Sequence, residues 1–332
     1  MTSIEWTDKS WNPWKGCSAV SPGCAHCYAE AMAKRLKGMG APGYADVIGG
    51  NGRWSGKLKL AEKTLEAPLR WRKPSRVFVN SMSDFFHEDA PDSWRDRAFA
   101  VMTLASRHTF QILTKRADLM RGYFEKPGRS DLIRQCARLT APEWPSDFPW
   151  PLPNVWLGVS VEDQRRADER VPQLLATPAA VRWLSCEPLL VPVDLTPWIG
   201  PWRDCDYFAA RPSAIQLREG IITCSRPENS SGKCQKGWCP FGFIGGIDWV
   251  VVGGESGHLA RGMNVEWARS IVRQCREAKV PVFVKQLGAR PFFVAPNGEP
   301  TPWIMNKGNR KGEWSEYWPE ELRVREWPGG GE

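Results

Sequence analysis

Several signals that would assign a function at once are missing from this 332-residue sequence. No apolar run approaches the roughly 18–20 residues that a membrane-spanning helix needs, so we expect no integral membrane protein. No G-x-x-x-x-G-K-[ST] loop and no G-x-G-x-x-G fingerprint occurs, so nucleotide hydrolysis and ordinary dinucleotide binding have no support. The polar, acidic start Met1–Trp6 lacks the basic and apolar regions of a signal peptide, which predicts a cytoplasmic protein.

Cysteine, tryptophan and positive charge are abundant instead. The chain has ten Cys and 19 Trp, and its 45 Lys and Arg against 37 Asp and Glu give a formal charge of +8. Disulfides are rare in a reducing cytosol, so clustered thiols point to metal ligands. The tryptophans fit either base-stacking platforms or an aromatic-rich core, and the charge permits an anionic partner such as nucleic acid.

Short runs rich in Val, Ile, Phe and Trp alternate with segments of helical spacing. Continuous apolar runs are typical of strands buried on both faces of a parallel sheet. The predicted strands are Val77–Asn80, Thr109–Leu113, Val155–Val161, Val181–Ser185, Asp248–Val252 and Val280–Val284, with one more before Cys17. The predicted helices are Asp92–Ala105, Gln164–Leu175 and Val265–Ala278.

This order of elements predicts an α/β fold, a complete or partial (β/α) barrel. We expect residues 1–194 to form the first part of the barrel and residues 247–291 its end. A Cys-rich insertion at residues 195–246 separates these parts, between late strands of the barrel. Residues 292–332 form a tail rich in Trp, Pro and Gly.

Each predicted strand ends in a cluster of polar residues. In β/α barrels the carboxyl ends of the strands meet on one rim, which carries the active site. Carboxylates there suit hydroxyl or ammonium groups, whereas lysine and arginine suit carboxylates or phosphates. The alternative is that each cluster only caps a helix or forms a turn. The rim residues are Asn80, Ser81, Asp84, Lys115, Arg116, Ser160, Glu162, Ser185, Glu187, Glu255 and Lys285.

Three cysteines, Cys17, Cys24 and Cys27, lie in a loop of Gly, Ser and Pro that leads directly into a predicted helix. The amino terminus of a helix helps to stabilise thiolate charge. A zinc site would normally take a fourth protein ligand, and His26 is awkwardly adjacent to Cys27. Three cysteines without an obvious fourth suit a [4Fe–4S] cluster that leaves one iron open.

This loop, opening a β/α barrel with Cys-x-x-Cys-Tyr entering a helix, resembles the radical S-adenosylmethionine (SAM) superfamily. Its C-x6-C-x2-C spacing differs from the usual C-x3-C-x2-C of that superfamily. The chain more closely resembles a phage-associated three-cysteine family of unassigned activity. The motifs that carry this resemblance, in order, are Ile4–Asp8, Trp11–Pro13, Gly23–Tyr28, Ser81–Phe85, Leu113–Arg116, Gly158–Glu162, Cys186–Leu189, Val252–Gly257 and Lys285-Gln286.

The resemblance implies a barrel of radical SAM type in which the three cysteines bind a [4Fe–4S] cluster and SAM binds the open iron. With an electron donor, SAM would be cleaved to a 5′-deoxyadenosyl radical. Residues 80–84 would lie near the methionine end of SAM, and Ser160 and Glu162 near its ribose. The implied cofactor-binding residues are Asn80, Ser81, Asp84, Lys115, Ser160, Glu162 and Ser185, and the candidate catalytic residues are Glu187, Glu255 and Lys285.

A second cysteine set, Cys205, Cys224, Cys234 and Cys239, lies inside the insertion. Four cysteines in a segment rich in Gly, Pro and Ser are typical of a metal-stabilised lobe. Zinc is the first interpretation for this set, and an auxiliary iron–sulfur cluster or free thiols are the alternatives.

Two functions follow from these features. The first is a radical SAM-like enzyme that acts on a nucleic acid or nucleotide. The second is a metal-stabilised, nucleic-acid-binding phage protein without radical chemistry. The second rests on the +8 charge, the tryptophans and the basic stretches Arg70–Lys73 and Lys307–Lys311, since aromatic and basic residues together suit single-strand binding.

Overall fold

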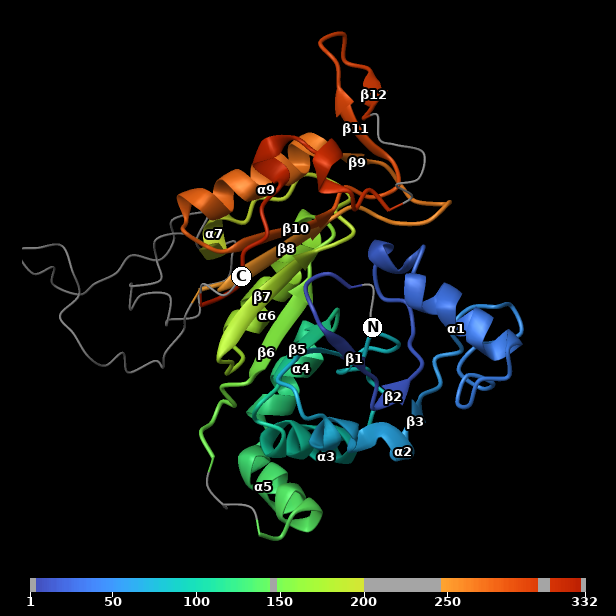
Figure 1. The fold of residues 1–332 in the computed structure, drawn as a ribbon, viewed down its shortest axis with the longest axis vertical. Coiled ribbons are helices and arrows are strands. Elements are labelled where there is room, and N and C mark those ends of the chain that lie inside the picture. The colour runs from blue at the N-terminus through green and yellow to red at the C-terminus, as the bar shows by residue number, and fades with distance from the viewer. Residues whose placement is uncertain (1–3, 144–147, 200–245, 304–310, 330–332) are drawn as a thin grey trace, which may run out of the picture.

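The computed structural model describes residues 4–143, 148–199, 246–303 and 311–329. Its centre is a seven-stranded parallel sheet in the order β1-β4-β5-β6-β7-β8-β10 (Figure 1). The sheet confirms the α/β prediction and all seven predicted strands, including the one expected before Cys17. The strands are β1 (Lys9–Trp11), β4 (Arg76–Val79), β5 (Thr109–Thr114), β6 (Val155–Ser160), β7 (Val181–Cys186), β8 (Trp249–Gly253) and β10 (Val282–Gln286).

The helices that follow these strands pack on one face of the sheet. They are α3 (Asp92–Leu104), α4 (Ala117–Glu125), α5 (Arg129–Thr140), α6 (Gln164–Leu175), α7 (Thr196–Ile199) and α9 (Val265–Glu277). Their apolar side chains share the main core with every second strand residue, for example Phe99 with Val77 and Val79. Helices on one face only are typical of a barrel wall, whereas doubly wound sheets carry helices on both faces.

The sheet is open, so the barrel is partial. β1 and β10 stand at its two edges, and no pairing between them occurs within the described residues. Neighbouring strands are all parallel, with registers such as Leu113 beside Gly158 and Trp183 beside Trp249. We call the face opposite the helices the inner face of this half-barrel.

Aromatic side chains cover the part of the inner face that lies toward the amino ends of the strands. Trp183, Trp249 and Phe283 project from β7, β8 and β10, and Trp6 and Trp327 pack on them from outside the sheet. Ring centroids are 5.2 Å apart for Trp6 and Trp183, and 4.9 Å apart for Phe283 and Trp327. These tryptophans therefore serve an aromatic core, which is one of the two roles that the sequence allowed.

A separate lobe joins β1 to β4. It contains β2 (Trp14–Lys15), α1 (Tyr28–Gly38) and β3 (Lys59–Leu60), with β2 antiparallel to β3. Figure 1 shows this lobe in blue beyond the β1 edge of the sheet. The short elements η1 (Pro22–Cys24), α2 (Glu62–Leu65) and η2 (Ala67–Arg70) complete it and lead back to β4.

The carboxyl-terminal residues contain short strands and helices in place of a simple tail. β9 (Met263–Asn264), β11 (Pro291–Val294) and β12 (Pro300–Pro302) make a small sheet, and η5 (Ser315–Tyr317) and η6 (Glu320–Leu322) follow. Trp318 and Leu322 are buried in the main core because they pack beside the outer face of the sheet. The insertion falls between the neighbouring strands β7 and β8, and its Cys205, Cys224, Cys234 and Cys239 lie outside the described residues.

Candidate functional site

The three-cysteine loop lies at the carboxyl end of the sheet. It follows β1 and β2, and Gly16 forms a parallel bridge with Ser83, which follows β4. The Gly16 amide donates to the Met82 carbonyl at 3.2 Å, and the Ser83 hydroxyl donates to the Gly16 carbonyl at 2.6 Å. The first cysteine is therefore fixed beside the residues that end β4.

Polar side chains of the loop attach it to three other strand ends. The Ser21 hydroxyl donates to the Glu162 carboxylate after β6, and His26 Nδ1 lies 3.0 Å from Glu255 Oε2 after β8. After β5, Arg116 donates to the Ser18 hydroxyl at 2.6 Å. Sequence reasoning missed Ser18, Ser21 and His26 in this role, because their partners are 98 to 229 positions away.

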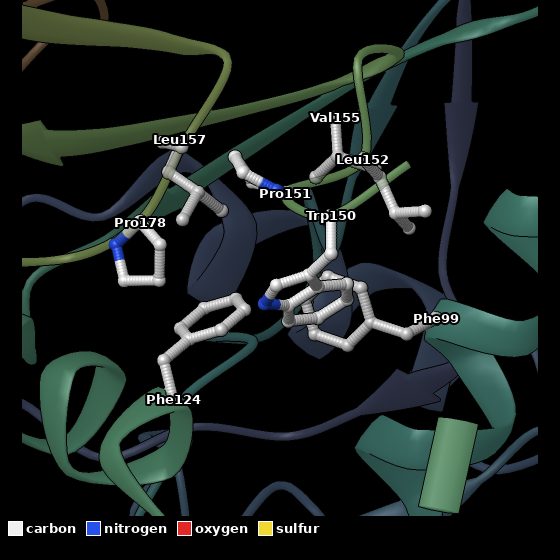
Figure 2. A pocket seen from close by; sticks show the side chains of 9 residues that line it. Phe99, Phe124, Trp150, Pro151, Leu152, Val155, Leu157 and Pro178 are labelled. Atoms are coloured by element: carbon white, nitrogen blue, oxygen red, sulfur yellow. The ribbon is translucent and has the colours of Figure 1, made fainter. Parts of the chain in front are cut away.

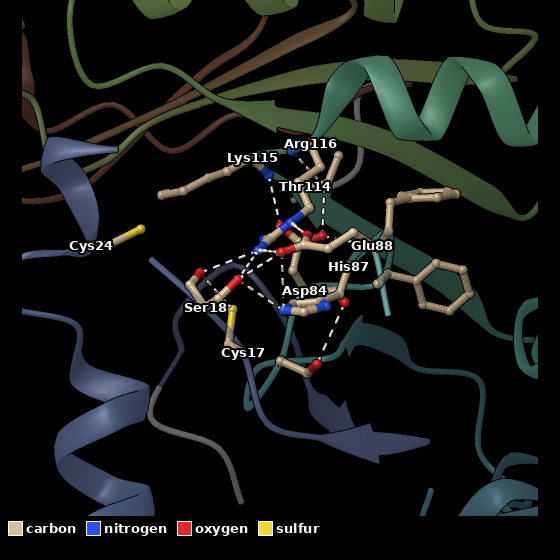
Figure 3. A network of polar contacts seen from close by, with 12 residues as sticks. Cys17, Ser18, Cys24, Asp84, His87, Glu88, Thr114, Lys115 and Arg116 are labelled. Atoms are coloured by element: carbon tan, nitrogen blue, oxygen red, sulfur yellow. Dashed lines mark hydrogen bonds and ion pairs between the residues drawn. The ribbon is translucent and has the colours of Figure 1, made fainter. Parts of the chain in front are cut away.

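Asp84 holds the ends of β4 and β5 together (Figure 3). Its carboxylate accepts hydrogen bonds from the Thr114 hydroxyl at 2.6 Å and from the backbone amides of Phe86 and Lys115 at 3.0 Å each. Arg116 adds an ion pair at 3.2 Å. Because the acceptor positions of Asp84 are already occupied, this residue acts as a scaffold for the rim.

Arg116 connects this scaffold to the cysteine loop through Ser18, Glu88 and His87. His87 is fully buried, and its Nδ1 accepts from the Asp89 amide, so the proton lies on Nε2, which donates to the Ser18 hydroxyl at 3.0 Å. Burial and the nearby Arg116 lower the pKa of His87. The neutral imidazole thus completes a network one residue from Cys17, as Figure 3 shows.

Glu162 is completely buried and ionised. Arg170 of α6 lies 2.6 Å from its carboxylate and Lys115 lies 3.5 Å away. Burial alone would raise the pKa of Glu162, but Lys115 and Arg170 together lower it to about 2. A Cβ at Gly23 would lie 2.5 Å from Glu162 Oε1, so only glycine allows the loop to come this close.

Glu255 anchors the other side of the loop. Arg261 holds its carboxylate with two guanidinium contacts, at 2.7 and 3.0 Å, and with its backbone amide at 2.8 Å. Burial opposes ionisation, yet the Arg261 and His26 hydrogen bonds lower the pKa of Glu255 to about 2. Glu255 therefore positions His26, in the middle of the cysteine motif, rather than presenting a free carboxylate.

Glu187 and Lys285 remain partly accessible on the inner face. Lys285 Nζ lies 2.6 Å from Glu187 Oε1, and 18% of each side chain is exposed. Glu187 directly follows β7 and Lys285 lies in β10, so they come from the strands on either side of β8. The two side chains meet because β8 has Gly253 between them. A Cβ at Gly253 would lie 3.2 Å from Glu187 Cδ. A partly accessible, paired acid and base can exchange their partners for groups of a ligand.

Polar residues follow the tryptophans on the same face of the sheet, because the side chains of a strand alternate between its two faces. Side chains two residues apart share a face of a strand. Ser160 follows Trp156 by four residues, and Ser185 follows Trp183 by two, so both serines lie on the inner face above the aromatic layer. Cys186, by contrast, is buried on the helix side and is not part of the rim.

Asn80 is the least satisfied residue of the rim. It is 3% exposed, has a left-handed backbone with φ of 58°, and neither polar atom of its side chain has a hydrogen-bond partner. Buried amides are almost always paired, so an unpaired one marks a position for a ligand or water. Its neighbour Ser81 donates to Asn12 Oδ1 at 3.2 Å and is part of the scaffold.

Two of the three thiols, those of Cys17 and Cys27, lie in an environment that disfavours the thiolate. Burial, with Asp84 nearby, raises the pKa of Cys17 to about 12, and burial also raises the pKa of Cys27. Deprotonation therefore depends on a bound cation. Within the described residues no three His, Cys, Asp or Glu side chains converge on one point, so the thiols would have to turn toward a shared metal.

Figure 2 shows an apolar pocket lined by Phe99, Phe124 and Trp150. It lies beside Val155, the first residue of β6, and therefore at the opposite end of the strands from the cysteine loop. Its lining carries no ionisable side chain, so it belongs to the packing of α3 and α4 on the sheet.

The fold and the rim define an α/β half-barrel protein with a cysteine loop fastened across the carboxyl ends of its strands. The chain belongs to the family described as "Protein of unknown function (DUF5131)", which it matches over residues 1–300. No curated protein and no solved structure gives a significant match. No described helix has both the length and the apolar character required to cross a membrane.

Proposed function

We propose that this protein is a radical SAM-like enzyme whose half-barrel holds a [4Fe–4S] cluster through Cys17, Cys24 and Cys27 and takes a nucleic acid or nucleotide as substrate. One observation carries the proposal. A loop with three cysteines, which meet no fourth metal ligand among the residues that the structure describes, is fixed by Ser18, Ser21 and His26 across the rim where β/α barrels bind their ligands.

The donor set fits the cluster. Three thiols in one loop leave one iron without a protein ligand, and α1 begins directly after Cys27, so its amino terminus faces the loop. When bound, the cluster and SAM together supply an electron and a 5′-deoxyadenosyl group for hydrogen abstraction. An electron donor completes the set of partners.

The remaining rim residues divide into two roles. Asp84, Glu162 and Glu255 are saturated with hydrogen bonds and hold the loop in place. The unpaired Asn80 amide and the accessible pair Glu187 and Lys285 are the groups that a cofactor or substrate can bind. An ammonium would pair with Glu187, and a carboxylate or phosphate would pair with Lys285.

The aromatic layer closes the inner face below this site. Trp183 and Trp249 are fully buried, and Trp6 covers them from outside the sheet. Water is therefore excluded from the aromatic end of the half-barrel, and a ligand can reach the inner face only from the rim.

The test is anaerobic reconstitution of the full chain with iron and sulfide, followed by measurement of bound iron and of 5′-deoxyadenosine formed from SAM and dithionite. We expect about four irons per loop cluster. Replacing Cys17, Cys24 or Cys27 by Ala should abolish both the cluster signal and 5′-deoxyadenosine. The matched control is Cys136→Ala on α5, outside the loop, which should retain both.

Electron paramagnetic resonance of the reduced protein separates the possible outcomes. A spectrum that changes on addition of SAM supports cofactor at the open iron. A complete cluster that never responds to SAM would contradict the proposal. Nucleic-acid binding that persists in the cysteine variants would then favour the metal-stabilised binding protein. Metal analysis of variants at Cys205, Cys224, Cys234 and Cys239 tests zinc or an auxiliary cluster in the insertion.

A further inference from the structure

Residues 14–60, the part of the β1–β4 lobe before α2, carry most of the excess charge of the protein. This segment has seven Lys and Arg against two Asp and Glu, so it contributes +5 of the total +8. One of its acids, Glu30, is buried and paired with Arg53 at 2.9 Å. We call this segment the basic lobe. It is continuous with the cysteine loop, because α1 begins at Tyr28, directly after Cys27.

The outward face of α1 has no acidic side chain. Lys34 and Arg35 are exposed, whereas Glu30 faces inward, where its carboxylate accepts from the Trp54 amide at 3.0 Å. In the described part of the chain neither Lys34 nor Arg35 has a carboxylate partner within 4.0 Å. By contrast, α6 pairs an exposed cation at i+4, Arg165 with Glu169.

The segment between α1 and β3 adds cations over a backbone with few side chains. It contains Gly43 and Gly52, both with positive φ. A Cβ at Gly52 would lie 3.2 Å from Lys34 Nζ, and a Cβ at Gly43 would lie 3.4 Å from Lys15 Nζ. The Lys34 ammonium therefore lies over bare backbone, whereas Lys15 Nζ donates to the Pro42 carbonyl at 2.9 Å and lies 4.5 Å from the Tyr44 ring centroid. Lysines above a glycine-rich turn allow a phosphate to approach both the side chain and the main chain.

An aromatic ring stands between this surface and the rim. Tyr28 is 54% exposed, and its hydroxyl is fixed by donation to the Ser81 carbonyl at 3.1 Å. An exposed ring held by its hydroxyl is a platform on which a base can stack, and stacking combined with backbone cations is how proteins bind single strands.

We propose that the basic lobe binds the phosphate backbone of a single-stranded nucleic acid and that Tyr28 stacks a base at the entrance to the rim. This inference rests on the nucleic-acid substrate in the proposed function and locates its binding surface. An acidic protein would need a broad interface with a packed apolar centre, whereas this face is made of separate cations, glycines and one fixed ring.

The basic stretch Arg70–Lys73 is a poorer candidate. It precedes β4 and so lies at the opposite end of that strand from the cysteine loop. Trp71 is already in use: Lys9 Nζ lies 4.6 Å from its ring centroid, and its ring packs against His108 at 5.7 Å. Arg72 and Lys73 are exposed and therefore provide a matched control.

The experiment measures binding of the full chain to fluorescein-labelled 20-nucleotide single-stranded RNA and DNA by anisotropy, at several salt concentrations. Two variants reverse charge on the lobe, Lys34→Glu/Arg35→Glu and Lys57→Glu/Lys59→Glu. The control Arg72→Glu/Lys73→Glu changes the net charge equally. We expect each lobe variant to bind about tenfold more weakly and to lower the salt slope of log K by about 1.4, which corresponds to two phosphate contacts. Tyr28→Ala should weaken binding without changing that slope.

The outcomes separate a failure of this binding surface from a failure of the proposed function. Equal weakening by the control and the lobe variants would overturn the surface, and so would failure of the wild-type chain to bind either strand at low salt. The binding assay does not require a cluster. Loss of cluster formation with intact lobe-dependent binding would refute the radical chemistry alone. Unchanged 5′-deoxyadenosine formation in the absence of nucleic acid is expected in the lobe variants, because the four substituted residues lie outside the three-cysteine loop.

Discussion

Two glycines on the inner face determine which side chains meet across the sheet. Gly158 of β6 lies beneath the Trp183 indole, and Gly253 of β8 lies between Glu187 and Lys285. In each case the missing side chain lets a group from one strand lean over its neighbour. The contacts that shape the candidate site therefore depend on two residues that have no side chain.

Gly158→Ala tests this dependence. Its Cβ would lie 2.5 Å from Trp183 Nε1, within a packed layer, so we expect a loss of about 1–3 kcal/mol in the free energy of unfolding. Denaturant unfolding followed by tryptophan fluorescence measures it. The control is Gly122→Ala in α4, where a Cβ meets no other atom within 4 Å and should be neutral or stabilising. Equal behaviour of the two variants would contradict the close packing of Trp183.

At the scale of residues, the acids of the rim could be predicted from the sequence, but the residues that pair with them could not. Acids at strand ends are visible because buried apolar runs stop there. Which of them are saturated depends on arginines elsewhere in the chain, namely Arg170 for Glu162 and Arg261 for Glu255. One signal for Arg170 was available: it lies on the apolar stripe of α6 with Ala167, Val171 and Leu174.

Among the elements, the cysteine loop depends most on others for its shape. It contains only the three-residue η1, so tertiary contacts rather than backbone hydrogen bonds define it. Glu162 is its deepest anchor, since it is buried between Arg170 and Ser21.

Glu162→Gln should release the loop. A neutral amide leaves the buried Arg170 without a counter-charge, so we expect a loss of about 2–4 kcal/mol in stability. We also expect faster hydrogen–deuterium exchange in residues 17–27. The control is Glu169→Gln, which breaks an exposed pair with Arg165 within α6 and should leave stability close to that of the wild type. Exchange in the loop that does not differ from the wild type would argue against the anchor.

Elements with a strong pattern were predictable. All seven strands and α3, α6 and α9 were predicted, because continuous apolar runs and clear stripes mark them. α5 was missed because its apolar residues do not mark one face: Leu132 and Leu139 are 44% and 79% exposed. The order of strands in the sheet follows from right-handed crossovers, but the placement of Trp318 and Leu322 in the core does not, since nothing local distinguishes them from a tail.

For the whole molecule, buried histidines link stability to pH. Burial, together with the neighbouring Arg107, lowers the pKa of His108. Its Nε2 contacts the Pro68 carbonyl at 3.2 Å, and its Nδ1 has no partner, so a second proton would be buried without an acceptor. The unfolded chain, with an ordinary histidine pKa of about 6.5, therefore binds this proton at higher pH than the folded chain does.

Unfolding free energy should accordingly fall as the pH drops below about 6.5. A second fall should follow below about pH 4.5, because Glu88, Glu162 and Glu255 have folded-state pKa values of about 2. Urea midpoints between pH 5 and 8 measure the first fall. His108→Gln should flatten it in part, since His87 titrates in the same direction. Identical slopes in the wild type and in His108→Gln would contradict this assignment.

The residues that pack over the inner face affect the order in which the chain can fold during synthesis. Trp6 and Trp327 pack on the same aromatic layer, and beside them Arg325 holds Glu5 at 2.8 Å across 320 positions of sequence. During translation all seven strands leave the ribosome before residue 327 does. The Phe283 ring, which Trp327 covers, therefore faces water until residue 327 has emerged, and the contact that covers it joins distant parts of the chain. Contacts of such long range form slowly, so the nascent half-barrel passes through a stage in which it is prone to aggregate.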